Sequence, residues 1–137
     1  MKHTFINILQ KLIDNEQSEN KITYKRKYEK YLSGEYSPTI SSCLQIAKNF
    51  NCSLDYLLGL STSKGSSPQL AAFNTQNFLN NYNSILERIN TSHWKFCREI
   101  NLDESTLRKW KKGAKPSVET LAKIATALNI SVYELIK

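Results

Sequence analysis

The side chains best suited to recognition chemistry lie in residues 102–113, L-D-E-S-T-L-R-K-W-K-K-G. Hydroxyl, guanidinium and ammonium groups dominate this segment, and all of them donate hydrogen bonds. We expect a helix here with Leu107 turned inward. A rotation of about 100° per residue then places Ser105, Lys109 and Lys112 on the outer face. Such a face fits the major groove of DNA, where side chains read base edges, although a solvated lysine-rich helix is the alternative interpretation.

Both ends of this segment carry helix-boundary signals. The carboxylate of Asp103 can accept a hydrogen bond from an amide of the first turn, which is the role of an N-cap. Gly113 supplies the permissive backbone at which a helix ends. We therefore expect a helix over 103–112, with Trp110 packed against a core rather than stacked on bases.

The charge of the chain points to an anionic partner. The 137 residues carry a formal charge of +7, of which +2 lies in the part up to Leu60 and +5 beyond it. Basic residues are densest in the second half, where five fall within eight positions: Arg108, Lys109, Lys111, Lys112 and Lys115. Nucleic acid and an anionic surface both fit this balance, and charge alone does not choose between them.

Several other classes of protein are not expected. No G-x-S-x-G, phosphate-cradling glycine loop or H-E-x-x-H is present, so we expect no enzyme. His3 and His93 are too far apart for a zinc site, and we expect no metal or cofactor. No apolar run of about 18 residues and no signal peptide occur, which favours a cytoplasmic protein without a membrane partner. The three cysteines fit small buried positions: Cys43, Cys52 and Cys97.

The remaining chain has helical patterns and no strand pattern. Apolar residues recur at helical spacing in 5–13 and again in 78–89. Helix N-caps are expected at Ser37, Ser53, Thr75, Ser92, Ser117 and Ser131. Residues 61–69, S-T-S-K-G-S-S-P-Q, have the composition of a flexible linker. We place one domain at 1–60, the linker at 61–74 and a second domain at 75–137.

The two halves repeat each other. At an offset of 78, P-T-I-S-S-C-L-Q-I-A-K-N-F-N-C-S-L-D-Y-L-L pairs with P-S-V-E-T-L-A-K-I-A-T-A-L-N-I-S-V-Y-E-L-I. At an offset of 79, Tyr31 pairs with Trp110 and Gly34 with Gly113. This self-similarity predicts an all-α protein made of two tandem five-helix modules.

Both halves resemble the Cro and phage-repressor type (Xre family) of helix-turn-helix domain, a lambda-repressor-like five-helix DNA-binding fold. The second half matches throughout, from S-H-W-K-F-C-R-E-I through D-E-S-T-L-R-K-W-K-K-G to Pro116, Ile124-Ala125 and Ser131. The resemblance implies a double-stranded DNA partner, with base contacts from Glu104, Ser105, Thr106 and Lys109. It implies phosphate contacts from Ser92, His93, Arg108, Lys112 and Lys115, and Arg108 can serve either role.

The first half departs from the family pattern. From the first aromatic residue of helix one to the expected start of the recognition helix there are 25 positions in the second half, Phe78 to Asp103, but 18 in the first, Phe5 to Thr23. We therefore expect helix two of the first half to be shortened or absent. Its cations form a second DNA face or a partner-binding or dimerisation face: Lys25, Arg26, Lys27 and Lys30.

Two functional hypotheses follow. The first is a sequence-specific transcriptional regulator, a repressor of phage or mobile-element type, acting as a homodimer or through both modules of one chain. Nine flexible linker residues would span about 17 Å on average and about 30 Å extended, so in-chain bivalency stays open. The second hypothesis is a protein-binding inhibitor or adaptor with a host protein partner, such as a phage anti-immunity protein of the anti-CRISPR kind. The tyrosine- and lysine-rich first half motivates it.

Overall fold

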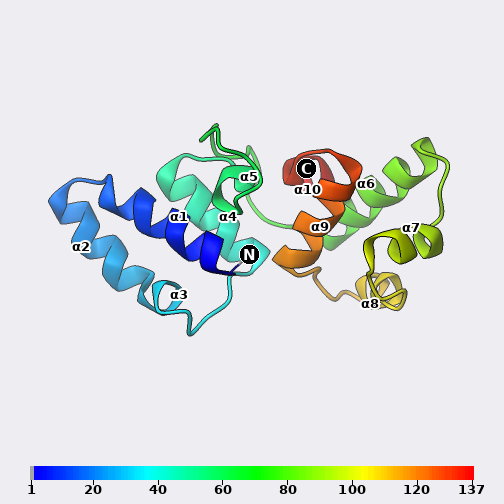
Figure 1. Ribbon diagram of the computed structural model, residues 1–137, viewed down its shortest axis with the longest axis horizontal. Coiled ribbons are helices and arrows are strands. Elements are labelled where there is room, and N and C mark those ends of the chain that lie inside the picture. Colours follow the sequence, from blue (N-terminus) through cyan, green and yellow to red (C-terminus); the bar gives the residue numbers. More distant parts are fainter. Residues whose placement is uncertain (1) are drawn as a thin grey trace. The chain divides into compact units, whose positions relative to one another are not determined.

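The computed structural model describes residues 2–137, and within that range its regular structure is entirely helical (Figure 1). This confirms the predicted all-α class. The chain divides into two compact units, Met1–Gln69 and Leu70–Lys137, and the division falls inside the segment in which we placed the linker. Among the described residues, no helix combines the length and the apolar character needed to cross a membrane.

Five helices form the first unit: α1 (Lys2–Asp14), α2 (Ser18–Lys27), α3 (Glu29–Leu32), α4 (Ile40–Phe50) and α5 (Leu54–Leu57). α1 and α4 supply most of the core, because each has apolar residues at helical spacing along one side. These residues are Phe5, Leu9, Leu12 and Ile13 of α1, and Ile40, Cys43, Leu44, Ile46, Ala47 and Phe50 of α4. α2 and α3 pack on α1, whereas α5 packs on α1 and α4.

The structure differs from our expectation between α1 and α4. We expected a helix to start at Thr23, but α2 runs through this residue, whose Oγ1 donates to the carbonyl of Glu19 (3.2 Å). Helix two is therefore present, and the expectation that it is shortened or absent was wrong. Tyr28 alone separates α2 from α3, so these helices follow each other without a multi-residue turn. The absence of this turn accounts for part of the difference in length between the first half and the second.

Aromatic contacts explain why so polar a segment folds as a helix. α2 buries none of its own residues. The Tyr24 ring lies 4.7 Å from the Phe50 ring between centroids, and Tyr28 is only 4% exposed. The side-chain amide of Asn49 donates to the Tyr28 hydroxyl, which satisfies a polar group that would otherwise be costly to bury. Two tyrosines therefore attach α2 to the core.

Five further helices form the second unit: α6 (Thr75–Arg88), α7 (His93–Ile100), α8 (Thr106–Lys111), α9 (Val118–Leu128) and α10 (Val132–Ile136). Its core is aromatic where α6 meets α8. The Trp110 ring lies edge-on to Phe78 (5.0 Å between centroids) and to Tyr82 (5.6 Å). Phe78 and Tyr82 are fully buried and Trp110 is 4% exposed, which confirms that Trp110 packs in the core.

Side-chain caps define most helix starts. The expected caps Ser53, Ser92, Ser117 and Ser131 all accept an amide of the first turn. The expected caps at Ser37 and Thr75 were wrong. α4 is capped by Thr39, which follows Pro38, and α6 is capped by Asn74. Several residues near each true start can accept a hydrogen bond, so sequence alone does not select the one with extended backbone geometry.

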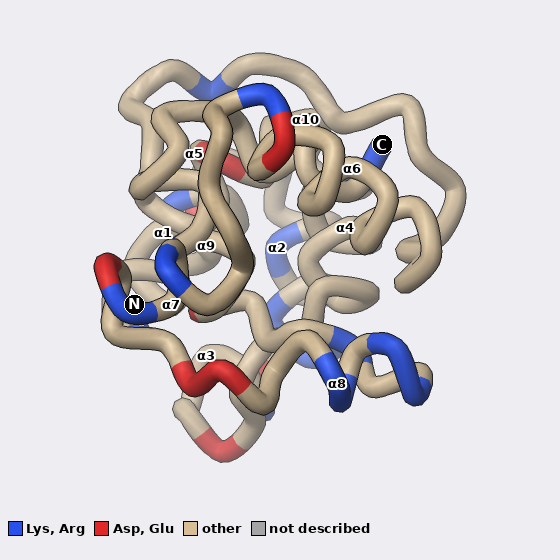
Figure 2. The backbone as a smooth tube through the Cα atoms, turned by 90° about the vertical axis from the view of Figure 1, so that its right-hand side faces the viewer, with Lys and Arg blue, Asp and Glu red and all other residues tan. Residues whose placement is uncertain are grey.

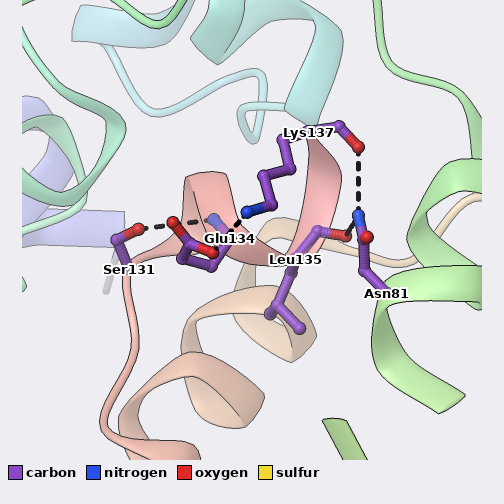
Figure 3. Close-up of polar contacts among 5 residues, drawn as sticks. All are labelled: Asn81, Ser131, Glu134, Leu135 and Lys137. Atoms are coloured by element: carbon purple, nitrogen blue, oxygen red, sulfur yellow. Dashed lines mark hydrogen bonds and ion pairs between the residues drawn. The ribbon is translucent and has the colours of Figure 1, made fainter. Parts of the chain in front are cut away.

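Figure 3 shows how α10 is tied to α6. The Nδ2 of Asn81 donates to the carbonyls of Leu135 (3.1 Å) and Lys137 (3.0 Å). Carbonyls at a helix C-terminus lack partners within the helix, so this amide satisfies two of them. The ammonium of Lys137 also pairs with the carboxylate of Glu134 (2.8 Å). The short α10 thus gains specific contacts at its end.

The segment after α5 is partly held against the first unit. The carbonyl of Lys64 accepts from the amide of Ser53 (2.8 Å), and both the amide and the hydroxyl of Ser67 donate to Asn51 Oδ1 (3.2 and 3.3 Å). In the second unit, the Phe73 ring lies 6.3 Å from that of Phe78. The stretch between these anchors is 68–72, and we call it the tether.

Candidate nucleic-acid interface

α7 and α8 are joined by a turn whose geometry the sequence supports. Ser92 caps α7, and Asn101 ends it in the left-handed region (φ 57°). Asparagine tolerates this backbone conformation better than most non-glycine residues. The amide of Leu102 then donates to the carbonyl of Cys97 (2.8 Å), which closes the end of α7. The chain consequently turns sharply before it enters α8.

Asp103 organises the start of α8. Its Oδ1 accepts from the amide of Ser105 (2.8 Å), and its carbonyl accepts from the hydroxyl of Thr106 (2.8 Å). The carboxylate of Asp103 accepts an amide as expected, but this amide belongs to the turn before the helix, and the N-cap of α8 is Ser105 rather than Asp103. The Ser105 amide lowers the pKa of the Asp103 carboxyl below its usual value. The regular helix starts later than we expected, however. α8 spans Thr106–Lys111 rather than 103–112, because residues 104 and 105 form a turn.

Trp110, not Leu107, defines the inner side of α8. Trp110 is buried and Leu107 is half-buried, so the helix is rotated relative to our expectation. The exposed cations of this segment are Arg108, Lys109, Lys111 and Lys112. The larger aromatic side chain gains more from burial than leucine does, and the edge-on contacts with α6 favour it further.

The predicted contact residues fall into two groups. Six of them are exposed: Ser92, Glu104, Arg108, Lys109, Lys112 and Lys115. Three are half-buried: His93, Ser105 and Thr106. The Thr106 hydroxyl donates within its own turn, to Asp103, so it is turned away from the exposed face. The structure therefore brings the cations together on one exposed surface and keeps part of the hydroxyl set inside.

Among the described residues, no ion pair holds a cation of α8, although the charges of Lys109 and Arg108 help to lower the pKa of the nearby Asp103 carboxyl. Figure 2 shows the Lys and Arg segments gathered at this helix. Between residues 2 and 137, the ion pairs join Lys30 to Glu35 and Lys137 to Glu134, and neither involves α8. Unpaired cations on a short exposed helix attract polyanions such as nucleic acid.

His93 occupies a position that sequence reasoning missed. Its Nδ1 lies 2.7 Å from the Tyr82 hydroxyl and its Nε2 lies 3.2 Å from the carbonyl oxygen of Glu104. A carbonyl oxygen only accepts, so in the neutral ring Nε2 donates to Glu104 and Nδ1 accepts from Tyr82. Burial raises the pKa of Tyr82, which keeps its hydroxyl protonated as a donor.

Both ring nitrogens of His93 are therefore engaged inside the protein. The phosphate contact that we assigned to this residue stays a prediction, and in the structure its ring links α6, α7 and the loop before α8. Nothing in the local sequence pattern signals this link, because Tyr82 lies on another helix. The only indirect indication is that a buried tyrosine hydroxyl, here that of Tyr82, usually has a hydrogen-bond partner.

The cations of the first unit do not share one helix. Lys25, Arg26 and Lys27 lie in the last turn of α2, whereas Lys30 lies in α3. Lys30 pairs with Glu35 (3.5 Å). The predicted second face is therefore spread over two consecutive helices.

One comparison with known proteins gives a match. Residues 87–135 match the family model described as helix-turn-helix, a range that contains α7, the turn and α8. No curated protein and no solved structure matches the chain. Most of the second unit is thus similar to the helix-turn-helix family, and this similarity suggests a DNA-binding regulator.

Proposed function

We propose that this protein is a sequence-specific transcriptional regulator that reads the major groove of double-stranded DNA with α8. The observation that carries the proposal is the helix-turn-helix match over α7, the turn and α8, combined with the exposed and unpaired cations of α8. A short helix that is anchored by a buried tryptophan on one side and basic on the other fits a groove.

The exposed side chains divide into those placed to contact base edges and those placed to contact phosphates. Lys109 and Arg108 point away from the core and are the leading candidates for base edges, with Ser105 and Glu104 beside them. Lys112 and Lys115 follow α8, and together with Ser92 at the start of α7 they contact phosphates. In this proposal Thr106 and His93 hold the loop before α8 instead of touching DNA.

The first unit is a divergent copy of the second in this proposal. Each unit has five helices in the same order, and equivalent aromatic residues meet edge-on in both. The Phe5 and Tyr31 rings are 6.2 Å apart at 80°, and the Phe78 and Trp110 rings are 5.0 Å apart at 81°. These parallels support an ancestral duplication followed by loss of the turn in the first unit.

We propose that specific binding uses a homodimer. One α8 makes few base contacts, and each contributes only about 1–3 kcal/mol of discrimination. The tether 68–72 spans about 12 Å on average and about 18 Å extended, whereas half-sites one helical turn apart are 34–36 Å from centre to centre, so the dimensions of the two units would have to supply the remainder. The short tether favours pairing of two chains over pairing of the two units within a chain.

The resemblance also supports a more specific role, a repressor of phage or mobile-element type acting in the cytoplasm. A domain of about this size, held in the groove of a promoter, excludes other proteins from the same sequence. Repression therefore needs only occupancy, and the described residues of this chain provide a binding surface without a catalytic arrangement.

The test combines binding-site selection with fluorescence anisotropy. The Arg108→Ala/Lys109→Ala variant should lose preference for the selected operator over a scrambled duplex by about tenfold or more. Arg88→Ala/Lys48→Ala, which removes one arginine and one lysine from exposed positions elsewhere, should keep the preference. Equal affinity of the unmodified protein for operator and scrambled DNA at 50 mM salt would overturn the proposal.

A protein-binding inhibitor or adaptor is the second candidate function. The observation that favours it is Trp94 on α7, which is 53% exposed and stacked under the guanidinium of Arg98 (4.6 Å to the ring centroid). Tryptophan and arginine are the residues most enriched at binding hot spots. Capture of a stoichiometric host protein by the unmodified chain, lost with Trp94→Ala, would support this function over DNA reading.

A further inference from the structure

The first unit carries a basic surface that the second unit's function does not explain. We call it the α2–α3 face, and it consists of Lys25, Arg26, Lys27 and Lys30, all exposed. Within the described part of the chain, neither Lys25 nor Arg26 forms an ion pair. Lys30 meets Glu35 only at the surface, where both side chains are more than half exposed.

The inner side of α2 fixes where these cations point. Tyr24 and Tyr28 pack against the core, so a rotation of about 100° per residue directs Arg26 outward. Lys25 and Lys27 then lie on its two flanks. The three cations fan across the solvent side of one helix end, and Lys30 follows in α3. Figure 1 shows α2 and α3 together along one edge of the first unit.

Two of these cations are held in place by aromatic rings. The ammonium of Lys27 lies 5.6 Å from the Tyr28 ring centroid, and that of Lys30 lies 5.1 Å from the Tyr36 ring centroid. Such cation–π contacts restrict the side chains before any partner binds. The face is therefore partly preorganised for an anion.

Interactions that stabilise the helices explain only part of the positive charge on the α2–α3 face. Cations in the last turn of α2 complement the negative end of its dipole, and this effect fades beyond that turn. Lys30 lies outside it. Residues 25–30 carry four cations and one carboxylate, that of Glu29, so a net charge of +3 remains. A polyanionic partner would relieve the repulsion among these cations.

We infer that the α2–α3 face binds the phosphate backbone of double-stranded DNA without reading its sequence. This inference rests on the proposed function, because it assigns the first unit to the same DNA molecule. Only Tyr28 lies between α2 and α3, so the first unit lacks the multi-residue turn that precedes a recognition helix. Exposed cations at a helix end suit phosphates, and phosphate contacts carry no direct sequence information.

The quadruple variant Lys25→Ala/Arg26→Ala/Lys27→Ala/Lys30→Ala tests the inference. The salt dependence of log K should become shallower by about 3 to 4, since each phosphate contact contributes about 0.9. Affinity should fall by about tenfold or more for operator and scrambled duplex alike, leaving their ratio unchanged. The matched control removes four exposed lysines from other parts of the first unit: Lys2, Lys11, Lys48 and Lys64.

A second variant tests the position of the face without deleting cations. Ile22 precedes Arg26 by one helical turn and is 65% exposed, so Ile22→Glu places a negative charge on the same side. It should weaken binding to both duplexes about equally. Leu60→Glu, at another exposed apolar position of the first unit, should weaken it less. Helical circular dichroism of each variant verifies that the chain still folds.

The outcomes separate this inference from the proposed function. If the quadruple variant behaves like its lysine control in salt slope and affinity, the α2–α3 face does not bind DNA. If it changes the operator preference more than the overall affinity, the face reads sequence and the inference is wrong. Loss of operator preference in the α8 variant still supports the function in either case.

Discussion

Nε2 of His93 forms a hydrogen bond with the carbonyl oxygen of Glu104 (3.2 Å) and so joins α7 to the loop that precedes α8. Nδ1 of the same ring forms a hydrogen bond with the hydroxyl of the buried Tyr82. The loop is also held by the amide of Leu102, which donates to the carbonyl of Cys97 (2.8 Å), and by the ammonium of Lys123, which donates to the carbonyl of Asn101 (3.2 Å). The orientation of α8 therefore depends on contacts that do not involve DNA.

Replacing His93 by alanine should destabilise the free protein. The change removes the His93 partner of the buried Tyr82 hydroxyl and leaves it only the weakly hydrogen-bonding thiol of Cys97, which costs about 1–3 kcal/mol. Chemical denaturation measures this loss, and amide exchange should accelerate in residues 102–106. Lys112→Ala serves as control because its side chain is exposed, so it should change the free energy of unfolding by less than about 0.5 kcal/mol. A fully stable His93→Ala protein with weakened DNA binding would instead indicate a direct phosphate contact.

Asn81→Ala should release the end of α10. The substitution removes the amide that donates to the carbonyls of Leu135 and Lys137, and we expect a loss of about 1–2 kcal/mol in unfolding free energy. Amide exchange in α10 should rise first. Asn83→Ala, an exposed site on the same helix, controls for the higher helix propensity of alanine. Equal stability of the two variants would contradict this role.

The carboxyl of Asp103 should contribute to the acid sensitivity of the second unit. Its pKa is lowered in the folded state, chiefly by the hydrogen bond from the Ser105 amide. A lowered folded pKa means that the stabilisation is present above the unfolded value, about 3.9, and is lost as the pH falls through the folded value. Asp103→Ala should therefore flatten the dependence of stability on pH below about 4. Glu119→Ala, which also removes an exposed carboxylate, should not.

The three cysteines should resist modification while the protein is folded. Burial raises the pKa of Cys43 to about 12 and that of Cys52 to about 11, and it also raises the pKa of Cys97. The reactive thiolate is therefore scarce at pH 8. A disulfide reagent should label the three thiols only in denaturant. An exposed cysteine introduced as Ser63→Cys should react at once under native conditions, and equally rapid labelling of a natural cysteine would contradict the prediction.

The sequence predicted helix starts and buried helix faces best where few residue types can fill the same structural role. Serine before an apolar helical stripe predicted four helix starts correctly, and the apolar spacing predicted α1 and α6. The packing of α8 was predicted only in part. Trp110 lies in the core as expected, against Phe78 and Tyr82, whereas Leu107 is half-buried rather than fully turned inward.

The least predictable features join residues that are distant in the chain. The continuous α2 depends on Tyr24 meeting Phe50, a contact that a local polar sequence does not reveal. His93 likewise depends on Tyr82 of another helix. Spacing within a segment gives the face of a helix, whereas the partner of that face follows only from the packed fold.

The brevity of the tether 68–72 has a kinetic consequence. If the first unit holds phosphates while the second reads bases, a tether of about 18 Å keeps the released reader at a high effective concentration beside the duplex. The second unit then rebinds the duplex at a neighbouring position before it diffuses away. The chain would search DNA by stepping along it, and lengthening 68–72 with glycine and serine would slow that search before it altered the chosen site.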